Sequence, residues 1–191
     1  MDARFRFDFN SPYAYLAASR IDGVLGADIS WEQIAFAFLL RAHDREPWSF
    51  HEPTRSEGQR ECERRAAAYG LPPLRWPPGW PVASYTLAAL RGAWAAQRLG
   101  GLRAFCAAAY ERNFVDGHGL NDAAMLDDVC ERAGLDAGEV RAHLDGYGRD
   151  RLRTATDAAI AEGVVGVPTV TVGTAHFWGD DRLEDAAAAL G

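Results

Sequence analysis

One short alternation near the N-terminus constrains the fold more than any other part of this sequence. In RFRFDF, residues 4–9, every second residue is phenylalanine, which is typical of a half-buried β-strand. The strand pattern stops at Asn10, and Pro12 then opens a helical pattern that runs to the glycines at positions 23 and 26. A second strand is predicted at about residues 28–35, so the chain begins strand, helix, strand, as parallel strand pairs do.

Helical patterns fill the middle of the chain. Apolar residues recur at helical spacing over residues 102–110 and 126–133, and Asp136 opens a capping-box pattern for a further helix. The loop LPPLRWPPGWP, residues 71–81, is too rich in proline for regular structure. We therefore predict a helical block over roughly residues 39–148.

The last part of the chain is mixed again. A helix is predicted through residues 152–160, and the β-branched run VVGVPTVTV at residues 164–172 predicts a buried strand apart from its proline. A partner strand follows at residues 175–178, and DRLEDAAAAL, residues 181–190, predicts a final helix. These elements together indicate an α/β fold, and 191 residues are enough to bury a core.

Charge and composition exclude several classes of function. The formal net charge is −7 at pH 7, whereas a general nucleic-acid binder needs a basic face. No apolar run approaches the ~20 residues that cross a bilayer, and the N-terminus has no signal-peptide pattern. We therefore expect a cytoplasmic protein with neither a membrane nor a nucleic acid as partner. Cys62, Cys106 and Cys130 form no CxxC pair, so neither a disulfide framework nor a metal site is expected.

Ser11-Pro12 lies where the first strand meets the first helix. Proline is favourable at the first helical position, and the free N–H groups and dipole of a helix start attract anions. The serine is therefore a candidate for holding a negatively charged group. The alternative is that Asn10 or Ser11 serves only as the N-cap of the helix.

Val167-Pro168 interrupts the predicted strand in a different way. A proline deletes a hydrogen bond of the strand ladder, and a cis peptide bond would account for its position. The alternative is a trans proline on an edge strand or at a bulge. Shortly afterwards, Asp180 and Asp181 flank a helix start, where they could receive the ammonium group of a ligand or act only as capping residues.

Three stretches together resemble one known family. FDFNSPYAYLA, GVVGVPTV and FWGDDRLED are similar, in order and spacing, to the 2-hydroxychromene-2-carboxylate isomerases and the kappa-class glutathione transferases. The resemblance implies a thioredoxin-like domain, within the DsbA-like group, that carries a large inserted α-helical domain. On this basis residues 1–38 and 149–191 form the discontinuous thioredoxin-like domain, and residues 39–148 form the helical insertion.

The resemblance also implies glutathione as cofactor and assigns roles to several residues. Ser11 would face the glutathione sulfur, and the backbone of Val167, before a cis Pro168, would pair with the peptide-like body of the tripeptide. Asp180 and Asp181 would hold its γ-glutamyl end. The remaining residues of the expected glutathione site are Trp178 and Gly179. The CxxC motif of the oxidoreductase relatives is absent at Ser11, which removes direct dithiol–disulfide exchange.

The substrate side of the site is less defined by sequence. Arg41 follows the second strand and, with His43, Arg45 and Arg55, is a candidate for stabilising an oxyanion; the alternative is an exposed run of charge. Asp44 lies near where the family often carries an asparagine that contacts glutathione or substrate, so Asp44 is a candidate substrate contact, as are Arg41 and Tyr85. Aromatic residues could form a wall for a flat ligand, or pack in the core; they are Trp48, Trp76, Trp80 and Tyr85.

The resemblance predicts a glutathione-dependent cis–trans isomerase that acts on an aromatic acid by reversible thiolate addition. One alternative is a kappa-like glutathione transferase that conjugates electrophiles. Another is a thioredoxin-like binding module without catalysis. Because family members tend to dimerise, a homodimer is expected.

Overall fold

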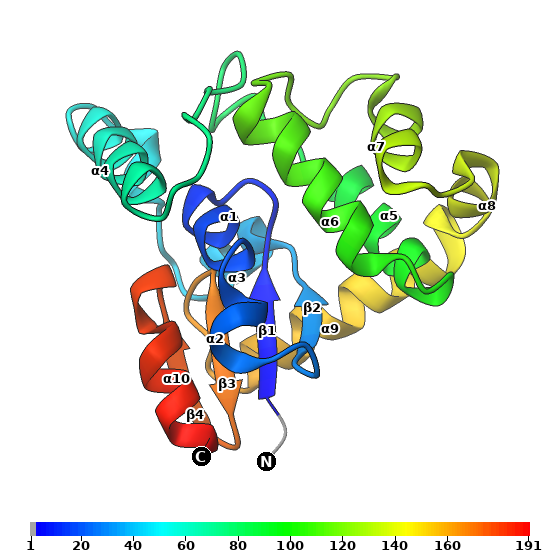
Figure 1. The fold of residues 1–191 in the computed structure, drawn as a ribbon. Coiled ribbons are helices and arrows are strands. Elements are labelled where there is room, and N and C mark those ends of the chain that lie inside the picture. Colours follow the sequence, from blue (N-terminus) through cyan, green and yellow to red (C-terminus); the bar gives the residue numbers. More distant parts are fainter. Residues whose placement is uncertain (1–2) are drawn as a thin grey trace.

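One four-stranded sheet joins the two ends of the chain. The computed structural model describes residues 3–191, and its strands lie in the order β2-β1-β3-β4 (Figure 1). β1 (Ala3–Phe7) is parallel to β2 (Ser30–Gln33) and antiparallel to β3 (Thr169–Val172), which pairs with β4 (Ala175–Trp178) in antiparallel fashion. The parallel start predicted from the sequence is confirmed, and the chain has the predicted α/β, thioredoxin-like fold.

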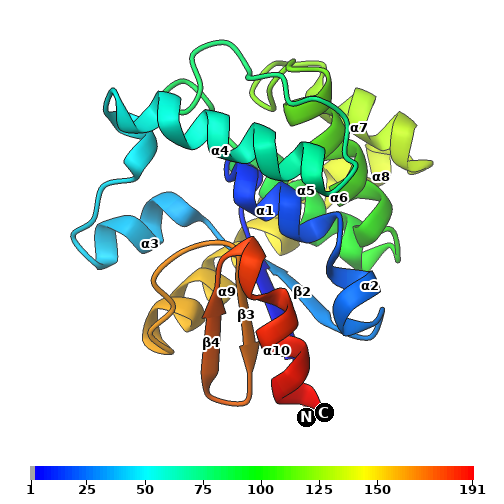
Figure 2. The ribbon, with the colours of Figure 1, turned by 60° about the vertical axis from the view of Figure 1, so that its left-hand side comes forward.

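The helix predicted after β1 is in fact two helices. α1 (Pro12–Ala18) ends where the Ser19 hydroxyl donates to the Leu16 carbonyl at 2.8 Å, and α2 (Ile21–Leu25) starts anew. A hydroxyl bonded back to the preceding turn competes with helix continuation. α2 packs beside α10 (Leu183–Leu190) on one face of the sheet (Figure 2).

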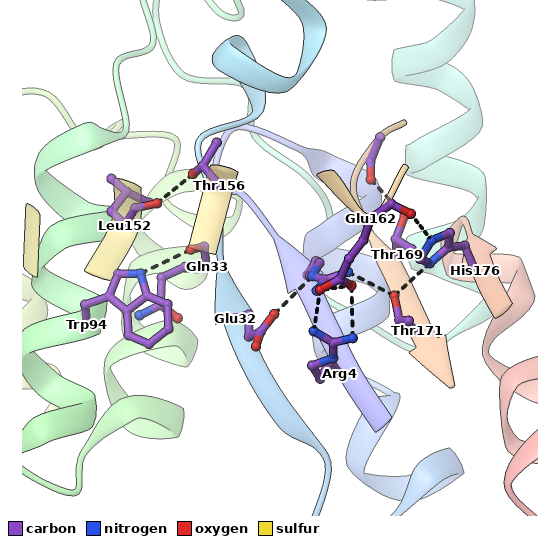
Figure 3. A network of polar contacts seen from close by, with 12 residues as sticks. Arg4, Glu32, Gln33, Trp94, Leu152, Thr156, Glu162, Thr169, Thr171 and His176 are labelled. Carbon is purple, nitrogen blue, oxygen red and sulfur yellow. Dashed lines mark hydrogen bonds and ion pairs between the residues drawn. The ribbon is translucent and has the colours of Figure 1, made fainter. Parts of the chain in front are cut away.

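The opposite face of the sheet carries a buried arginine. Arg6 of β1 is fully buried and donates to Glu32 at 3.0 Å and to Glu162 at 2.8 Å. Glu162 follows α9 (Arg149–Ala161), the helix predicted through residues 152–160, and it also accepts two bonds from Arg4 at 2.9 Å. Figure 3 shows that this network joins α9 to the sheet strands.

The strand predicted at residues 164–172 is shorter than expected. β3 begins only at Thr169, because Pro168 has no N–H to donate to a ladder. The peptide bond between Val167 and Pro168 is cis, as predicted. Val164 leaves the sheet and packs with Ile34 and Leu39 in a small separate cluster.

Helices connect β2 to β3, as the sequence predicted for the middle of the chain. Besides α9, they are α3 (Phe36–Ala42), α4 (Thr54–Ala68), α5 (Leu87–Arg98), α6 (Leu102–Tyr110), α7 (Met125–Ala133) and α8 (Ala137–Ala142). Short helical turns lie at Trp48–Phe50, Glu111–Val115, Leu144–Gly148 and Asp180–Arg182. Residues 71–81 contain no helix or strand, as predicted. No helix within residues 3–191 has both the length and the apolar character needed to cross a bilayer.

The core runs across the inserted helices and the sheet without a break. Phe9 packs against Phe105 and Tyr110 of α6, with ring centroids 6.5 and 5.0 Å apart. The division into residues 1–38, 39–148 and 149–191 stays a prediction; its first boundary falls inside α3, and its second coincides with the start of α9.

Candidate functional site

A cavity of about 850 Å³ is lined by residues of α1, α3 and α4 and by the segment just before β3. Within residues 3–191, all the large hydrophobic side chains that are exposed line this cavity; they are Phe38, Phe50, Val82, Tyr85, Leu87, Val165 and Trp178. Exposed apolar surface concentrated in one concave place marks a binding site. The cavity therefore suits a ligand with a substantial apolar part.

Ser11 lies in the cavity wall and caps α1. Its side-chain oxygen accepts from the Ala14 N–H at 3.2 Å, so Ser11, and not Asn10, is the N-cap of this helix. The hydroxyl also donates to the Val167 carbonyl, but at 3.4 Å this bond is long and weak. The O–H of Ser11 can therefore turn to a ligand at little cost while its lone pair keeps the cap.

The backbone of Val167 offers unused hydrogen-bonding capacity at the same place. No described residue accepts from its N–H, and its carbonyl receives only the long bond from Ser11. A buried backbone N–H is normally paired. An extended peptide-like ligand that adds beside Val167 would satisfy both groups, as in strand addition to a sheet edge.

Asp8, which the sequence interpretation missed, also lines the cavity and connects the segments around Ser11 by hydrogen bonds. Its buried carboxylate accepts from the N–H groups of Asn10 and Phe36, both at 2.9 Å, and from the Thr86 hydroxyl at 2.7 Å. Burial raises the pKa of Asp8, and these hydrogen bonds oppose the shift. The carboxylate thus ties the end of β1 to the starts of α3 and α5. Its position among the alternating phenylalanines was the one sequence signal, because it must point away from their face.

Asp180 and Asp181 both line the cavity but differ in availability. The buried carboxylate of Asp180 accepts from Arg65 Nη1 at 2.8 Å and from the Tyr69 hydroxyl at 3.0 Å. Burial raises the pKa of Asp180, while the ion pair with Arg65 opposes the shift. Asp181 has a side chain 55% exposed and only a 3.4 Å contact with Arg65. Of the predicted pair, Asp181 is therefore the carboxylate free to receive a ligand.

Arg65 and Tyr69 are hydrogen-bond partners of Asp180 that the sequence did not indicate. Both lie on or next to α4, and Arg65 lies 115 positions before its partner Asp180. Arg65 also holds Glu61 at 2.7 Å, so its charge is already matched by several carboxylates. No local pattern could reveal a pairing between segments so far apart.

Trp178 and Gly179 form part of the cavity wall, next to Asp180 in the sequence. A side chain at Gly166 would lie 2.5 Å from the Trp178 indole, so the indole rests directly on that glycine. The Gly179 N–H donates to the Pro168 carbonyl at 3.0 Å, and its φ of +125° is one that side chains rarely allow. Trp178, Gly179 and Pro168 all line the cavity, as expected of the predicted site.

The basic residues after β2 separate into two groups. Arg41 and Arg45 line the cavity, whereas Arg55 does not and instead pairs with Glu52. His43 is also outside, where its Nε2 contacts the Val164 carbonyl at 2.9 Å. The predicted substrate contact of Asp44 is not supported, because this residue forms the left-handed turn after α3, with a φ of +50°, outside the cavity.

The predicted aromatic wall is partly present. Trp48 and Trp80 line the cavity with ring centroids 5.8 Å apart, and Tyr85 is an exposed lining residue. Trp76 packs behind Trp80 at 4.6 Å and donates to Glu63 at 2.8 Å, so it buttresses the wall without lining it.

The three cysteines are free and buried, and none lines the cavity. Burial raises the pKa of Cys62 to about 12 and that of Cys130 to about 11, and it raises the pKa of Cys106 further. These thiols are therefore protonated at neutral pH. Among residues 3–191, no group of His, Cys, Asp and Glu side chains is arranged to hold a metal ion.

Comparisons with known proteins give a consistent set of similarities. The profile of the DSBA-like thioredoxin domain matches residues 4–191. A 2-hydroxychromene-2-carboxylate isomerase from Sphingobium xenophagum is 31% identical over 188 residues, covering 94% of this chain and 93% of that protein. A solved structure of a 2-hydroxychromene-2-carboxylate isomerase gives a TM-score of 0.82 at 26% identity, covering 100% of this chain and 95% of the other. A probable DsbA oxidoreductase from Streptomyces coelicolor shares the fold, with a TM-score of 0.76 at 22% identity over 100% of this chain and 88% of its own.

Proposed function

The chain belongs to the DSBA-like thioredoxin domains and, among them, to the 2-hydroxychromene-2-carboxylate isomerase family, and we propose that it is a glutathione-dependent isomerase of that type. Its substrate would be an unsaturated aromatic acid formed during the degradation of aromatic compounds. The observation that carries the proposal is the cavity itself, which the exposed apolar side chains and Ser11 line together.

The residues present fit glutathione. The unpaired N–H and nearly free carbonyl of Val167 suit the backbone of its cysteine, and Ser11 lies beside that point at 3.4 Å. Asp181 would receive the ammonium group of the γ-glutamyl end, and Arg65 contacts both Asp180 and Asp181. The backbone pairing fixes the register, and the carboxylate fixes the direction of the tripeptide.

When bound, glutathione would supply a thiolate that adds to the conjugated carbon of the substrate and departs after rotation about the bond has become free. A free thiol has a pKa of ~8.5, so it is mostly protonated at neutral pH. A hydrogen bond from the Ser11 hydroxyl to the sulfur favours the ionised form and lowers the thiol pKa. Ser11 thus acts as a donor to the sulfur and not as a nucleophile.

The substrate would lie on the apolar side of the cavity. Trp48 and Trp80 offer faces to a flat ring, and Tyr85 borders the opening. Negative charge that develops on the carbonyl oxygen of the substrate during addition needs a donor or cation. Arg41 lines the cavity, where its guanidinium group lies over the ring of Phe38, 5.9 Å from the centroid. It has no ion-pair partner among residues 3–191, so it is the residue we assign to that charge.

The glutathione transferase alternative uses the same bound thiolate but keeps it in the product. The two functions are separated by an assay with glutathione limiting. An isomerase converts many equivalents of 2-hydroxychromene-2-carboxylate for each glutathione present, and glutathione is recovered unchanged. Consumption of one glutathione per product molecule would replace the isomerase proposal by the transferase.

A further inference from the structure

Arg45 is an exposed residue that lines the cavity and makes two contacts there. Its guanidinium group donates from Nη1 to the Val165 carbonyl at 3.0 Å and stacks over the Trp178 ring, 5.0 Å from the centroid. Trp178 in turn rests on Gly166, where no Cβ would fit. Stacking and a carbonyl bond together orient a guanidinium group without using up its charge.

The charge of Arg45 is not matched by a carboxylate. No acidic side chain in residues 3–191 lies within ion-pair distance of it, and the neighbouring Glu46 instead contacts His51 at 2.8 Å. Arg65, which also lines the cavity, has three carboxylates around it. An arginine has five N–H donors, so Arg45 keeps several for a ligand.

The groups along the cavity wall follow one order. Arg45 contacts Val165, Ser11 contacts Val167, and Gly179, which precedes Asp180 and Asp181, contacts Pro168. A cation, a hydroxyl and a carboxylate are thus arranged along a stretch from residue 165 to 168, which spans at most about 11 Å. Glutathione has a similar length. It carries an ammonium group and a carboxylate at its γ-glutamyl end and a second carboxylate at its glycine end.

We propose that Arg45 is the carboxylate-binding residue of this cavity, opposite to the ammonium-binding Asp181. The proposal rests on the function proposed above. The carboxylate has two available sources, the glycine end of glutathione and the acid group of the aromatic substrate. Both would form charge-assisted hydrogen bonds with the same guanidinium group.

The test compares Arg45→Gln with the wild-type chain by calorimetric titration. Glutathione is titrated alongside its glycine amide, and 2-naphthoate alongside 2-naphthamide, so that each acid has a neutral counterpart. Arg55→Gln is the matched control, because Arg55 lies nearby but outside the cavity. Arg45→Lys keeps the charge without the planar fork and should retain part of the affinity.

Arg45→Gln should weaken the acid of one pair about tenfold and leave its amide unchanged. Loss for glutathione identifies the glycine carboxylate, and loss for 2-naphthoate identifies the substrate acid; either supports the proposal. Equal affinities of the wild type and the variant for both acids would overturn it. If the wild-type chain binds no glutathione, the proposed function fails, and the naphthoate pair alone decides the role of Arg45.

Discussion

The Ser11 hydroxyl lies 3.4 Å from the Val167 carbonyl, although the two residues are 156 positions apart in the chain. One ends the loop after β1, and the other precedes the cis peptide bond before β3. The antiparallel pairing of β1 with β3 brings these two segments together. The fold therefore places a hydroxyl donor beside a backbone edge that can bind a peptide.

Replacing Ser11 tests its role in ionising a bound thiol. Ser11→Ala should raise the pKa of bound glutathione and slow turnover, because the hydrogen bond to the sulfur is lost. It should also cost about 1 kcal/mol of stability through the lost N-cap. Ser11→Thr, which keeps the hydroxyl and the cap, is the control. Titration of ultraviolet thiolate absorbance measures the pKa; identical curves for wild type and Ser11→Ala would exclude the role.

Gly179 controls the position of Asp181. A Cβ at Gly179 would lie 2.4 Å from the Asp181 carboxylate, and the φ of +125° is unfavourable for alanine. Gly179→Ala should therefore displace that carboxylate and weaken glutathione binding several-fold. Gly173→Ala is the control, since it has a positive φ of +58° but nothing near its Cβ. Affinities measured for both variants should differ; an equal effect would mean that backbone strain alone is responsible.

The ion pair of Arg65 with Asp180 should stabilise the fold. Arg65→Met leaves a buried carboxylate unpaired and should cost about 2–3 kcal/mol at pH 7, somewhat less than for a fully buried pair. Because burial already raises the pKa of Asp180 and loss of Arg65 raises it further, the cost should shrink as pH falls and the carboxyl takes up a proton. Denaturant unfolding at several pH values measures this. Adding Asp180→Asn to the Arg65→Met variant should recover part of the lost free energy of unfolding. If the double variant instead loses the sum of the two single losses, the pairing is contradicted.

The hydrogen bonds of Glu162 should make the stability of the fold depend on pH in the acidic range. Burial raises the pKa of Glu162, but hydrogen bonds from Arg4 and Arg6 outweigh it and lower the pKa below 4.5. A lowered carboxyl pKa contributes stability that is full above the unfolded-state value and is lost as pH falls through the folded value. Glu162→Gln should therefore lose less free energy of unfolding than wild type on acidification below about pH 4.5. The exposed Glu139→Gln should follow the wild-type curve.

Much of the fold, and part of the candidate site, could be predicted from local sequence patterns. The alternation of phenylalanines predicts a strand, the proline after Ser11 predicts a helix start, and the proline after Val167 predicts a cis peptide bond. All three follow from short-range sterics, and all three are confirmed. The break between α1 and α2 was missed, because it depends on a single hydroxyl bond at Ser19.

The hydrogen bonds and ion pairs that hold the site residues in position could not be predicted from local sequence patterns. Asp8 meets Thr86 across 78 positions, and Asp180 meets Arg65 across 115. Such pairings follow from how α4 packs beside α1 and how α5 packs beside β2, which no local spacing encodes. The same holds for Arg45 and Trp178, which stack on each other in the cavity wall although they are far apart in the sequence.

The most direct measurement is a calorimetric titration of glutathione into the wild-type chain, in two buffers of different ionisation enthalpy, at a pH below that of the free thiol pKa. The account predicts saturable binding with release of up to one proton per site, and a smaller release for Ser11→Ala. Absence of binding, or binding with no proton released, would contradict it.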